Sequence, residues 1–507
     1  MKTILFLVVL CLTGLVRCVP KKYGFNFSEP LSHASVSEGS LTHVLGKTGQ
    51  IYTFVSKTGM MLWKNNVTAL LHGTNLPKLY RFDDVRLSVW NGMYLLVTCG
   101  PPARLLVIDR LRGTLTWVTT LASHFAATAD GGGALLGDLM YVGMGSSQKE
   151  MSVLRKKPCC DFVGSVAAVN LRAGQKVWQT DVIPKKITGK TSMSGAEVSS
   201  FPPVASSDER TLYVTTEALH FKDRDPSDWS CWNVSRGAKD PCFLEDPNVT
   251  SHSSVIALRA ATGAKRWVRR FNATEAWNLA CVDGSSNCPS APTWDSGFSN
   301  GVSVAKVCNG EKKGATCRDV VYAVQNTGIL YALDAATGEL LWHSVAHAPE
   351  FSFVKPGNPL VVNDNAVYDL VTNPFGETWI GCDGSSYSGS GFSVRDALTG
   401  ECLDVVSEPA WSIKSRLKPK GNGIYVSIAV KKENAFAEPW VVSDASMLCK
   451  YSRNSDPKLS CVISEGSNVE TYPIVSTDDL TCVYTGPQNY PSPAAATHRL
   501  DCEYSGP

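Results

Sequence analysis

Residues 329–342 read ILYALDAATGELLW, and four other segments of the chain repeat the same pattern. They are segments 51–63, 105–117, 165–178 and 254–267. In all five a glycine precedes a terminal tryptophan by four residues. With 41 glycines and 13 tryptophans among 507 residues, random placement predicts about one such pair. The five copies with similar flanks therefore indicate an internal repeat.

Each copy has the form of a β-hairpin. An apolar strand such as 105–109 runs into a short turn, where glycine takes a backbone conformation with positive φ. The tryptophan then stands on a fixed face of the outgoing strand and offers a large flat surface to the next unit. A sixth copy, 392–404, keeps Thr399 and Gly400 and has Asp404 where tryptophan is expected.

The spacing of the repeats predicts the fold. Intervals of about 50 to 90 residues between successive tryptophans suit four-stranded propeller blades with insertions. We therefore predict an all-β fold, a β-propeller with tryptophan-docking repeats, in preference to a solenoid or a pair of sandwiches. The expected domains are a signal peptide at 1–18, an N-terminal segment at 19–39, the propeller at 40–465 with an insertion at about 218–252, and C-terminal strands or a tail at 466–507 that close the propeller.

Composition excludes several classes of protein. Apolar residues make up 44% and charged residues 19%, which excludes a disordered chain and allows a large core. Forty-eight basic side chains stand against 46 acidic ones, for a net charge of +2. Without a long basic stretch, this near-neutral balance argues against nucleic-acid binding.

The N-terminus predicts export from the cytoplasm. Lys2 precedes an apolar run at 4–16, which has the form of a secretory signal with cleavage after Cys18; an uncleaved anchor is the alternative. No later apolar run is long enough to span a membrane. Five sequons predict a glycoprotein, at Asn26, Asn66, Asn233, Asn248 and Asn272. We expect a secreted or extracellular protein, or one in the lumen of the secretory or endolysosomal pathway.

The cysteines fit the same compartment. Of 17 cysteines, 15 lie outside the predicted signal, which predicts disulfide bonds. Proximity in sequence suggests six pairs: Cys231–Cys242, Cys281–Cys288, Cys308–Cys317, Cys382–Cys402, Cys449–Cys461 and Cys482–Cys502. Cys99, Cys159 and Cys160 remain, and no CxxC spacing favours a zinc site.

The repeat form A-x-D-x-x-T-G-x-x-x-W resembles the tryptophan-docking motif of quinoprotein alcohol dehydrogenases, propellers that bind pyrroloquinoline quinone (PQQ). It is most similar to the eukaryotic polyvinyl-alcohol-dehydrogenase-like branch. The resemblance is strongest over residues 136–345, through the segments MYVGMGSSQKE, CCDFVGSVAAVN, LYVTTEA, AWNLAC and VYAVQNTGILYALD. It implies an eight-bladed β-propeller with PQQ seated on a calcium ion in the central channel.

The resemblance also implies a set of site residues. In the family, a Glu and an Asn ligate calcium, a Trp stacks on the quinone, a cation lies nearby, and an Asp takes the proton of the alcohol. Calcium prefers hard oxygen ligands and polarises the quinone as a Lewis acid. Glu150 matches the metal-ligating Glu, at the end of VGMGSSQKE. A solvated glutamate at a strand end is the alternative interpretation of Glu150.

The other family positions depart from the pattern. Ser199 stands at the stacking Trp, the segment 216–218 reads Thr-Glu-Ala at the Asn, and Gly297 stands at the Asp. Asp295 lies two residues before Gly297 and is the candidate base, although two residues along a strand move a side chain by about 7 Å. A turn carboxylate is the alternative. Asn326 takes the place of the cation.

Cys159 and Cys160 are adjacent in the chain. Neighbouring Cα atoms lie about 3.8 Å apart, which is shorter than the usual disulfide span, so a vicinal disulfide is strained. Such a bond serves in some quinoproteins as a platform against the cofactor. By this resemblance Cys159, Cys160 and Asn326 are candidate cofactor contacts, while separate bridges to other cysteines remain open for the pair.

Two functions fit the sequence. In the first, the protein is a pseudoenzyme that has lost PQQ and calcium and acts as a binding or scaffold protein. Its partner would be a protein or a glycan on the propeller loops, where Trp229, Trp232 and Trp294 could stack on sugars. In the second, it is a PQQ- and calcium-dependent dehydrogenase of alcohols or polyols, with Glu150 on the metal and Asp295 as the base.

Overall fold

The fold is taken from a computed structural model of the 507-residue chain. It describes residues 21–31, 35–72, 85–129, 131–148, 160–184, 193–198, 201–221, 251–271, 296–309, 316–345, 360–363, 365–371, 378–388, 390–407, 411–420, 423–431, 443–451, 459–465, 469–476, 480–487 and 498–504.

Antiparallel four-stranded sheets make up the first half of the described chain. The first sheet contains β2 (Val36–Glu38), β3 (Leu41–Leu45), β4 (Gln50–Val55) and β5 (Met61–Asn66), and helix α2 (Val67–Leu70) follows it. The second contains β6 (Arg86–Trp90), β7 (Tyr94–Cys99), β8 (Arg104–Asp109) and β9 (Leu115–Thr120). The next has five strands: β10 (Ala127–Thr128), β11 (Gly133–Leu136), β12 (Leu139–Ser146), β13 (Ser165–Asn170) and β14 (Gln175–Asp181). Then come β16 (Val204–Ala205), β17 (Thr211–Thr215), β19 (Ser254–Arg259) and β20 (Lys265–Arg270).

The second half repeats this organisation. One sheet contains β21 (Val302–Cys308), β22 (Cys317–Val324), β23 (Ile329–Asp334) and β24 (Leu340–Val345). The next contains β25 (Val361–Asn363), β26 (Ala366–Val371), β29 (Gly391–Asp396) and β30 (Cys402–Ser407). Another contains β31 (Trp411–Lys420), β32 (Gly423–Lys431), β33 (Ser443–Tyr451) and β34 (Leu459–Glu465). Two small two-stranded sheets pair β15 (Met193–Gly195) with β18 (Leu219–Phe221), and β27 (Trp379–Ile380) with β28 (Ser386–Tyr387).

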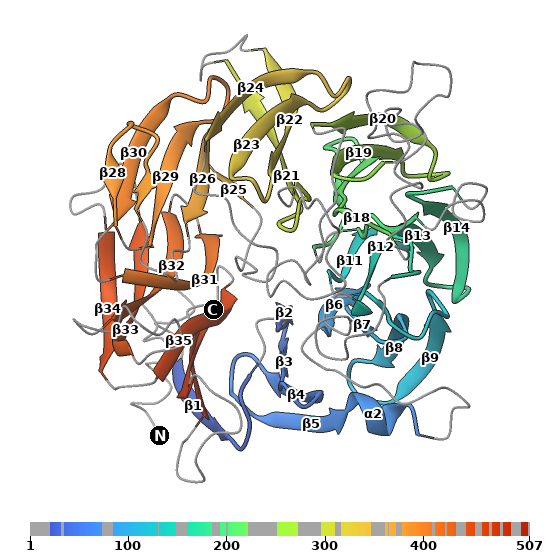
Figure 1. Ribbon diagram of the computed structural model, residues 1–507. Helices are drawn as coiled ribbons and strands as arrows, with labels where there is room; N and C mark the ends of the chain where they lie inside the picture. Colours follow the sequence, from blue (N-terminus) through green and yellow to red (C-terminus); the bar gives the residue numbers. More distant parts are fainter. Residues whose placement is uncertain are drawn as a thin grey trace.

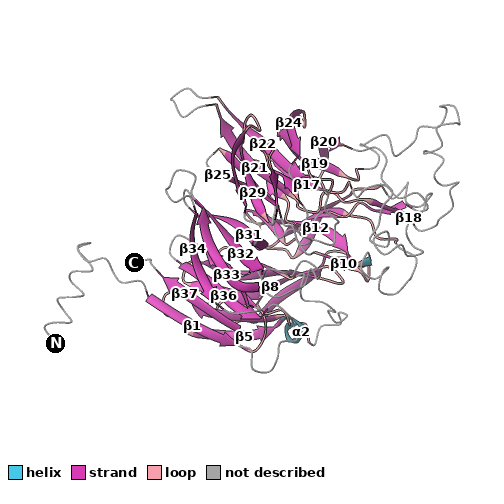
Figure 2. Cartoon of the chain, turned by 60° about the vertical axis from the view of Figure 1, so that its left-hand side comes forward, coloured by secondary structure: helices cyan, strands magenta, loops and turns pink. Residues whose placement is uncertain are grey.

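The last sheet joins the two ends of the described chain. It contains β35 (Val469–Ser476), β36 (Leu480–Pro487), β37 (His498–Tyr504) and the first strand, β1 (Lys21–Phe27). Strand β1 pairs with β37 from Lys21 opposite Tyr504 to Phe27 opposite His498. In Figure 1 the sheets follow one another in chain order around a central region, from blue at the bottom to red beside β1. Figure 2 shows that strands dominate the described part of the chain.

The repeated tryptophans dock between neighbouring sheets, as the sequence predicts. A Cβ atom added at Gly113 would lie 2.6 Å from the Trp63 ring, and one added at Gly263 would lie 2.4 Å from the Trp178 ring. Trp267 and Trp342 meet Gly338 and Gly400 in the same way, at 2.7 and 2.8 Å, whereas Trp117 lies at the ordinary contact distance of 3.4 Å from a Cβ added at Gly174. Each ring therefore packs on the glycine of the following repeat, and at four of the five contacts a side chain there would overlap the ring.

The same glycines also close the hairpin turns. Gly113 has φ +70° and Gly263 has φ +70°, a conformation that side chains with a Cβ rarely adopt. An Asp or Asn side chain at the start of the turn often fixes the conformation of the turn by accepting hydrogen bonds from its backbone. Asp334 Oδ1, for example, accepts hydrogen bonds from the backbone N–H groups of Ala336 and Thr337, both at 3.0 Å. Positive φ and close ring packing together explain why the repeat keeps glycine.

Arg110 ties the first sheet to the second. It stands in the turn between β8 and β9 and is 4% exposed. Its Nε donates to His43 Nε2 (2.7 Å), Nη1 to Gly92 O (3.0 Å), and Nη2 to Leu41 O (3.1 Å) and to Glu38 O. We call this set of hydrogen bonds the Arg110 contact; it supplies donors to four acceptors, and its bonds to His43 Nε2 and Leu41 O are buried.

We expect the Arg110 contact to make stability depend on pH through His43. Burial and the nearby Arg110 charge lower the pKa of His43 to about 3. The folded protein therefore keeps this ring neutral, whereas the unfolded chain binds a proton below pH 6.5. Stability should be full above pH 6.5 and fall by about 1.4 kcal/mol per pH unit as the pH drops towards 3.

Urea unfolding between pH 7 and 5 measures this dependence, and His43→Gln provides the comparison because it has no titrating ring. The expected difference between the two proteins changes by about 2 kcal/mol from pH 6.5 to pH 5. Identical slopes in the wild type and in His43→Gln would contradict the assignment of this pH dependence to His43.

Two of the predicted disulfides are present among the described side chains. Cys308 bonds Cys317, and Cys382 bonds Cys402. Cys99 is free and buried, and burial raises the pKa of its thiol to about 12. Cys99 therefore stays a protonated thiol in the core. Among the residues that the structure describes, no helix is both long and apolar enough to cross a membrane.

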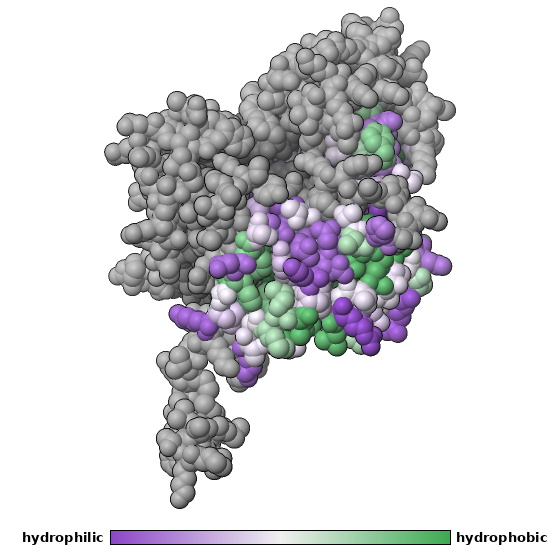
Figure 3. Space-filling view, turned by 90° about the horizontal axis from the view of Figure 1, so that it is seen from below, coloured by the Kyte–Doolittle hydropathy of each residue, from purple (hydrophilic) through white to green (hydrophobic). Residues whose placement is uncertain are grey.

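The described surface carries several exposed apolar side chains near hairpin turns. Met93 is 60% exposed and Leu111 is 71% exposed, and Arg110 N donates to Met93 O at 3.0 Å, so the two turns lie side by side. Met60 is 59% exposed in the first sheet's outer hairpin. Figure 3 shows a face on which hydrophobic patches interrupt the hydrophilic surface.

Candidate functional site

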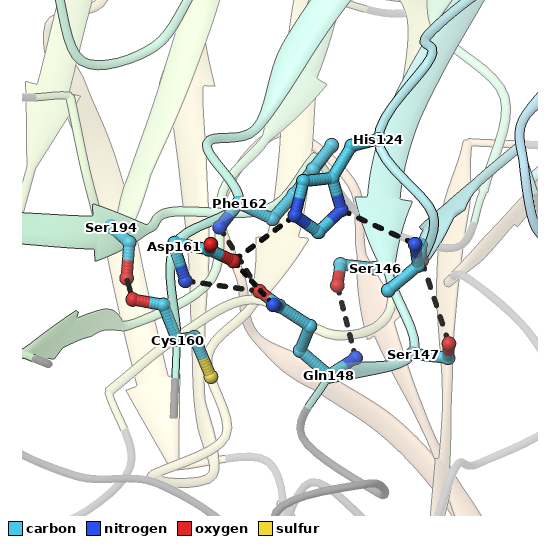
Figure 4. A network of polar contacts seen from close by, with 9 residues as sticks. His124, Ser146, Ser147, Gln148, Cys160, Asp161, Phe162 and Ser194 are labelled. Atoms are coloured by element: carbon cyan, nitrogen blue, oxygen red, sulfur yellow. Dashed lines mark hydrogen bonds and ion pairs between the residues drawn. The ribbon is translucent and has the colours of Figure 1, made fainter. Parts of the chain in front are cut away.

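The first part of the candidate site lies where β12 ends. Gln148 follows this strand, and its side-chain oxygen accepts hydrogen bonds from Asp161 N (3.1 Å) and Phe162 N (3.0 Å). Its amide nitrogen donates to Asp161 Oδ1 at 2.5 Å. Figure 4 shows this cluster from close by. One side chain thus holds together the described residues on either side of segment 149–159.

His124 adds a hydrogen bond to this cluster. Its Nε2 lies 3.0 Å from Asp161 Oδ1, and its Nδ1 accepts from Ala126 N at 3.2 Å. The His124 side chain is 24% exposed and that of Asp161 55% exposed, so water screens the pair. The ring also lies 5.5 Å from the Phe162 ring. The pair orients Asp161 and is open to solvent.

The predicted residues Glu150 and Cys159 lie outside the described residues, next to this cluster in sequence. Cys160 is described: it is 4% exposed and disulfide-bonded, and its carbonyl accepts a hydrogen bond from Ser194 Oγ at 2.6 Å. A disulfide between Cys160 and Cys159 stays a prediction. Gln148 and Ser194 fix the backbone at Cys160 from two sides (Figure 4).

The second part of the site is a pair of buried glutamates that sequence reasoning did not find. Glu197 and Glu217 lie between the Val198–Thr216 bridge and the Gly195–Leu219 pair, and Glu217 N donates to Glu197 O at 2.8 Å. Glu197 is 7% exposed and Glu217 is 6% exposed. Their only signal in the sequence is an acidic residue among small and apolar ones, in SGAEVSS and VTTEAL.

Asn326 connects to the same region. Its Oδ1 accepts from Ser299 N (3.1 Å), and its Nδ2 donates to Ser299 Oγ (3.0 Å). Ser299 Oγ in turn donates to Glu217 Oε2 at 3.4 Å. Asn326 is 5% exposed. The structure therefore brings together the predicted Asn326 and the unpredicted Glu217 through Ser299.

The other positions implied by the resemblance offer few ligands. Ala218 stands at the metal-ligating Asn, is 1% exposed, and presents only a methyl group. Gly297 stands at the catalytic Asp and presents no side chain, although its carbonyl accepts from Asn326 N at 2.9 Å. Asp295 and Ser199 lie outside the described residues. The described positions thus do not fit a calcium-bound quinone.

A metal centre of three or more His, Cys, Asp or Glu side chains does not occur in the described part of the chain. Several buried oxygen atoms there nevertheless have no hydrogen-bond partner, among them Thr128 Oγ1, Ser253 Oγ and Asn300 Oδ1. Ser253 also has φ +47°, and its N–H donates to Glu217 O at 3.1 Å. The described region around the two glutamates therefore contains several buried side-chain oxygen atoms.

Comparison with known proteins places the chain in a family. A family profile described as "Outer membrane protein assembly factor BamB" matches residues 21–277, about half of the chain. A polyvinylalcohol dehydrogenase of Pseudomonas sp is 20% identical over 334 residues, which are 63% of this chain and 46% of that protein. Another, of Sphingopyxis sp. (strain 113P3), is 20% identical over 354 residues, which are 64% of this chain and 47% of that protein. The chain thus spans about half the length of these curated relatives.

Solved structures share the fold. A quinohemoprotein alcohol dehydrogenase of Pseudomonas putida HK5 superposes with a TM-score of 0.59 at 14% sequence identity, covering 97% of this chain and 76% of that one. Together with the docked tryptophans, the matches confirm the predicted superfamily. The chain belongs to the PQQ_2 family, within the quinoprotein alcohol dehydrogenase-like β-propellers.

Proposed function

We propose that this protein is a secreted propeller with a degenerate cofactor site that acts as a binding or scaffold protein. The observation that carries the proposal is the chemistry at the positions of the metal-ligating Asn and the catalytic base. Ala218 and Gly297 have no side-chain oxygen there, so neither can ligate calcium through its side chain or accept a proton from an alcohol.

Charge and hydrogen bonding support the same proposal. PQQ is an anion, so a cationic side chain nearby favours its binding. Asn326 stands where the family commonly has a cation, and its amide uses both polar atoms on Ser299. A neutral, internally bonded amide supplies no attraction for a quinone carboxylate.

We also propose that the propeller has eight blades. Seven four-stranded sheets and one five-stranded sheet lie in the described part of the chain, and β1 completes the last of them by pairing with β37. The exposed apolar turns at Met93 and Leu111 offer one surface for a partner, because exposed apolar clusters often mark protein contacts. The disulfides fit an oxidising compartment.

A dehydrogenase of alcohols or polyols is the second candidate, and the two curated relatives are named for that activity. It requires Glu150 as the calcium ligand and Asp295 as the base. PQQ would then supply the quinone that accepts two electrons from the alcohol, while Asp295 would hold the substrate proton.

Titration with PQQ in the presence of calcium separates the two candidates. For the full-length protein we expect no saturable heat of binding at high micromolar PQQ and no reduction of a dye by a panel of alcohols. The physical reason is the missing oxygen ligands at Ala218 and Gly297. Stoichiometric PQQ binding with alcohol-dependent dye reduction, both abolished by Glu150→Ala, would overturn the scaffold proposal and establish the dehydrogenase.

A further inference from the structure

One backbone hydrogen bond recurs in six of the described sheets. It runs from an N–H group in the turn between the last two strands to a carbonyl near the start of the neighbouring strand, over 2.8 to 3.1 Å. In the second sheet it joins Arg110 N to Met93 O, and in the third sheet it joins Leu171 N to Asp138 O. The bond brings two residues of each sheet to equivalent places: the one with the carbonyl and the one after the donor.

The residues at these two places differ from sheet to sheet. In the third sheet they are Asp138 and Arg172, and Arg172 Nε lies 2.5 Å from Asp138 Oδ2 in an ion pair. In the second sheet they are Met93 and Leu111. The pairs of the other four sheets each include a polar side chain: Ser40 and Lys57, Arg210 and Ala261, Asp319 and Ala336, and Asn365 and Leu398. Among these six described sheets, the second alone has two apolar side chains at these places.

The fold does not need the apolar pair in the second sheet. The recurring hydrogen bond is 3.0 Å long in the second sheet and 2.9 Å long in the third, so a polar pair supports the same geometry. Met93 is nevertheless 60% exposed and Leu111 is 71% exposed. Exposed apolar surface is unfavourable in water, and on adjacent turns it often marks a protein contact. Methionine is also among the residues that are enriched in protein interfaces.

Charged side chains of both signs flank the apolar pair. The side chain of Arg112, next to Leu111, is 79% exposed, and that of its ion-pair partner Asp109 is 28% exposed. In the neighbouring sheet the side chain of Arg172 is 71% exposed and that of Asp138 is 35% exposed. A partner of one charge sign, such as an anionic membrane or a nucleic acid, would meet like charges here. A surface with an apolar centre and a rim of both signs is complementary to a second copy of itself.

We propose that a second copy of this chain covers Met93 and Leu111, in a symmetric dimer. In a two-fold arrangement the same surface serves on both copies, so the apolar centres meet and the rims can pair opposite charges. The net charge of +2 adds little repulsion between two copies. This inference names a partner for the apolar surface in the proposed function, and it rests on the binding role proposed there.

The dimer would leave the candidate site free on both copies. Strand β12 begins next to Asp138 and ends at Ser146, two residues before Gln148. About 25 Å of extended strand therefore separates the turns of the proposed interface from the candidate site. Two copies joined through these turns would present two candidate sites, so a partner with two matching epitopes would gain avidity.

Sedimentation velocity of the purified full-length protein, between about 1 and 100 µM, tests the proposal. Met93→Asp combined with Leu111→Arg gives the second sheet the pair that the third sheet already carries, so the fold should persist. Val345→Asn is the matched control, because Val345 is 62% exposed on β24 of another sheet.

We expect the average mass of the wild type and of Val345→Asn to rise with concentration towards twice the monomer value. The double variant should dimerise at least about tenfold more weakly, with an unchanged urea midpoint. A wild type that stays monomeric over the whole range, or a double variant that dimerises equally, would overturn the proposal. If the double variant fails to fold, Met93→Ser with Leu111→Lys, the pair of the first sheet, decides: unchanged dimerisation overturns the proposal and weakened dimerisation supports it.

Flotation with phosphatidylserine vesicles is the companion measurement. A monomeric wild type that binds these vesicles, and loses binding in the double variant, would overturn the dimer in favour of a membrane surface. Both measurements omit PQQ, so a failure of the dimer is distinguishable from a failure of the scaffold proposal in the PQQ titration.

Discussion

Replacing Trp178 by alanine is expected to lower the free energy of unfolding by about 3 kcal/mol, near the lower end for loss of a large aromatic ring because this one is only partly buried. The ring packs on Gly263, where a Cβ would lie 2.4 Å away, and on Tyr141 with ring centroids 5.9 Å apart. Its Nε1 donates to Ala260 O at 3.0 Å. Alanine removes all three contacts and leaves a cavity between two sheets. Urea unfolding of the purified protein measures the loss.

The adjacent residue provides the matched control. Val177 is 53% exposed, so Val177→Ala should change stability by less than about 0.5 kcal/mol. Gly263→Ala tests the other side of the contact, because its methyl would overlap the ring at a position with φ +70°. In the double variant with Trp178→Ala the overlap with the ring disappears and only the one with Thr180 Oγ1, at 2.5 Å, remains. The loss of stability in the double variant should therefore be smaller than the sum of the two single losses. A Trp178→Ala protein as stable as the wild type would refute the docking role.

Replacing Arg110 by leucine is expected to cost about 3 kcal/mol of unfolding free energy, because two buried acceptors lose their donor and each costs about 1–3 kcal/mol. Those acceptors are His43 Nε2 and Leu41 O, and the part-buried carbonyl groups of Gly92 and Glu38 lose a hydrogen bond as well. The loss should appear as a lower urea midpoint at pH 7.

Arg112 is the control for this substitution, since it lies in the same turn with a side chain 79% exposed and an ion pair to Asp109. Arg112→Leu removes the same charge and should stay within about 0.5 kcal/mol of the wild type. Equal losses in Arg110→Leu and Arg112→Leu would mean that net charge, and not the Arg110 contact, carries the effect.

The repeat was predictable from sequence because one local unit recurs. Each copy needs glycine for its turn and tryptophan for the neighbour, so the spacing of the two residues identifies the hairpin before any long-range contact is known. The disulfides Cys308–Cys317 and Cys382–Cys402 followed from proximity for the same reason: hairpin strands bring nearby cysteines together. The pairing of β1 with β37 joins residues more than 470 positions apart, and no local pattern indicates its register.

The candidate site was predicted only in part. The sequence singled out Asn326 as the residue at the position of the cation. It did not predict the hydrogen bonds of Asn326 to Ser299, because they require the turn before β21, which carries Ser299, to lie beside Asn326. Glu197 and Glu217 were missed because an isolated glutamate reads as a surface residue until its burial is known.

By itself the sequence determined the all-β repeat and the family, because turn glycines and docking tryptophans act within one hairpin and its neighbour. Only the tertiary structure decided which polar atoms are buried together. Ser299 joins Glu217 to Asn326, and the Arg110 contact joins residues 38–43 to 92 and 110. Such sets form when sheets distant in sequence pack side by side, and burial then removes the water that would otherwise satisfy them.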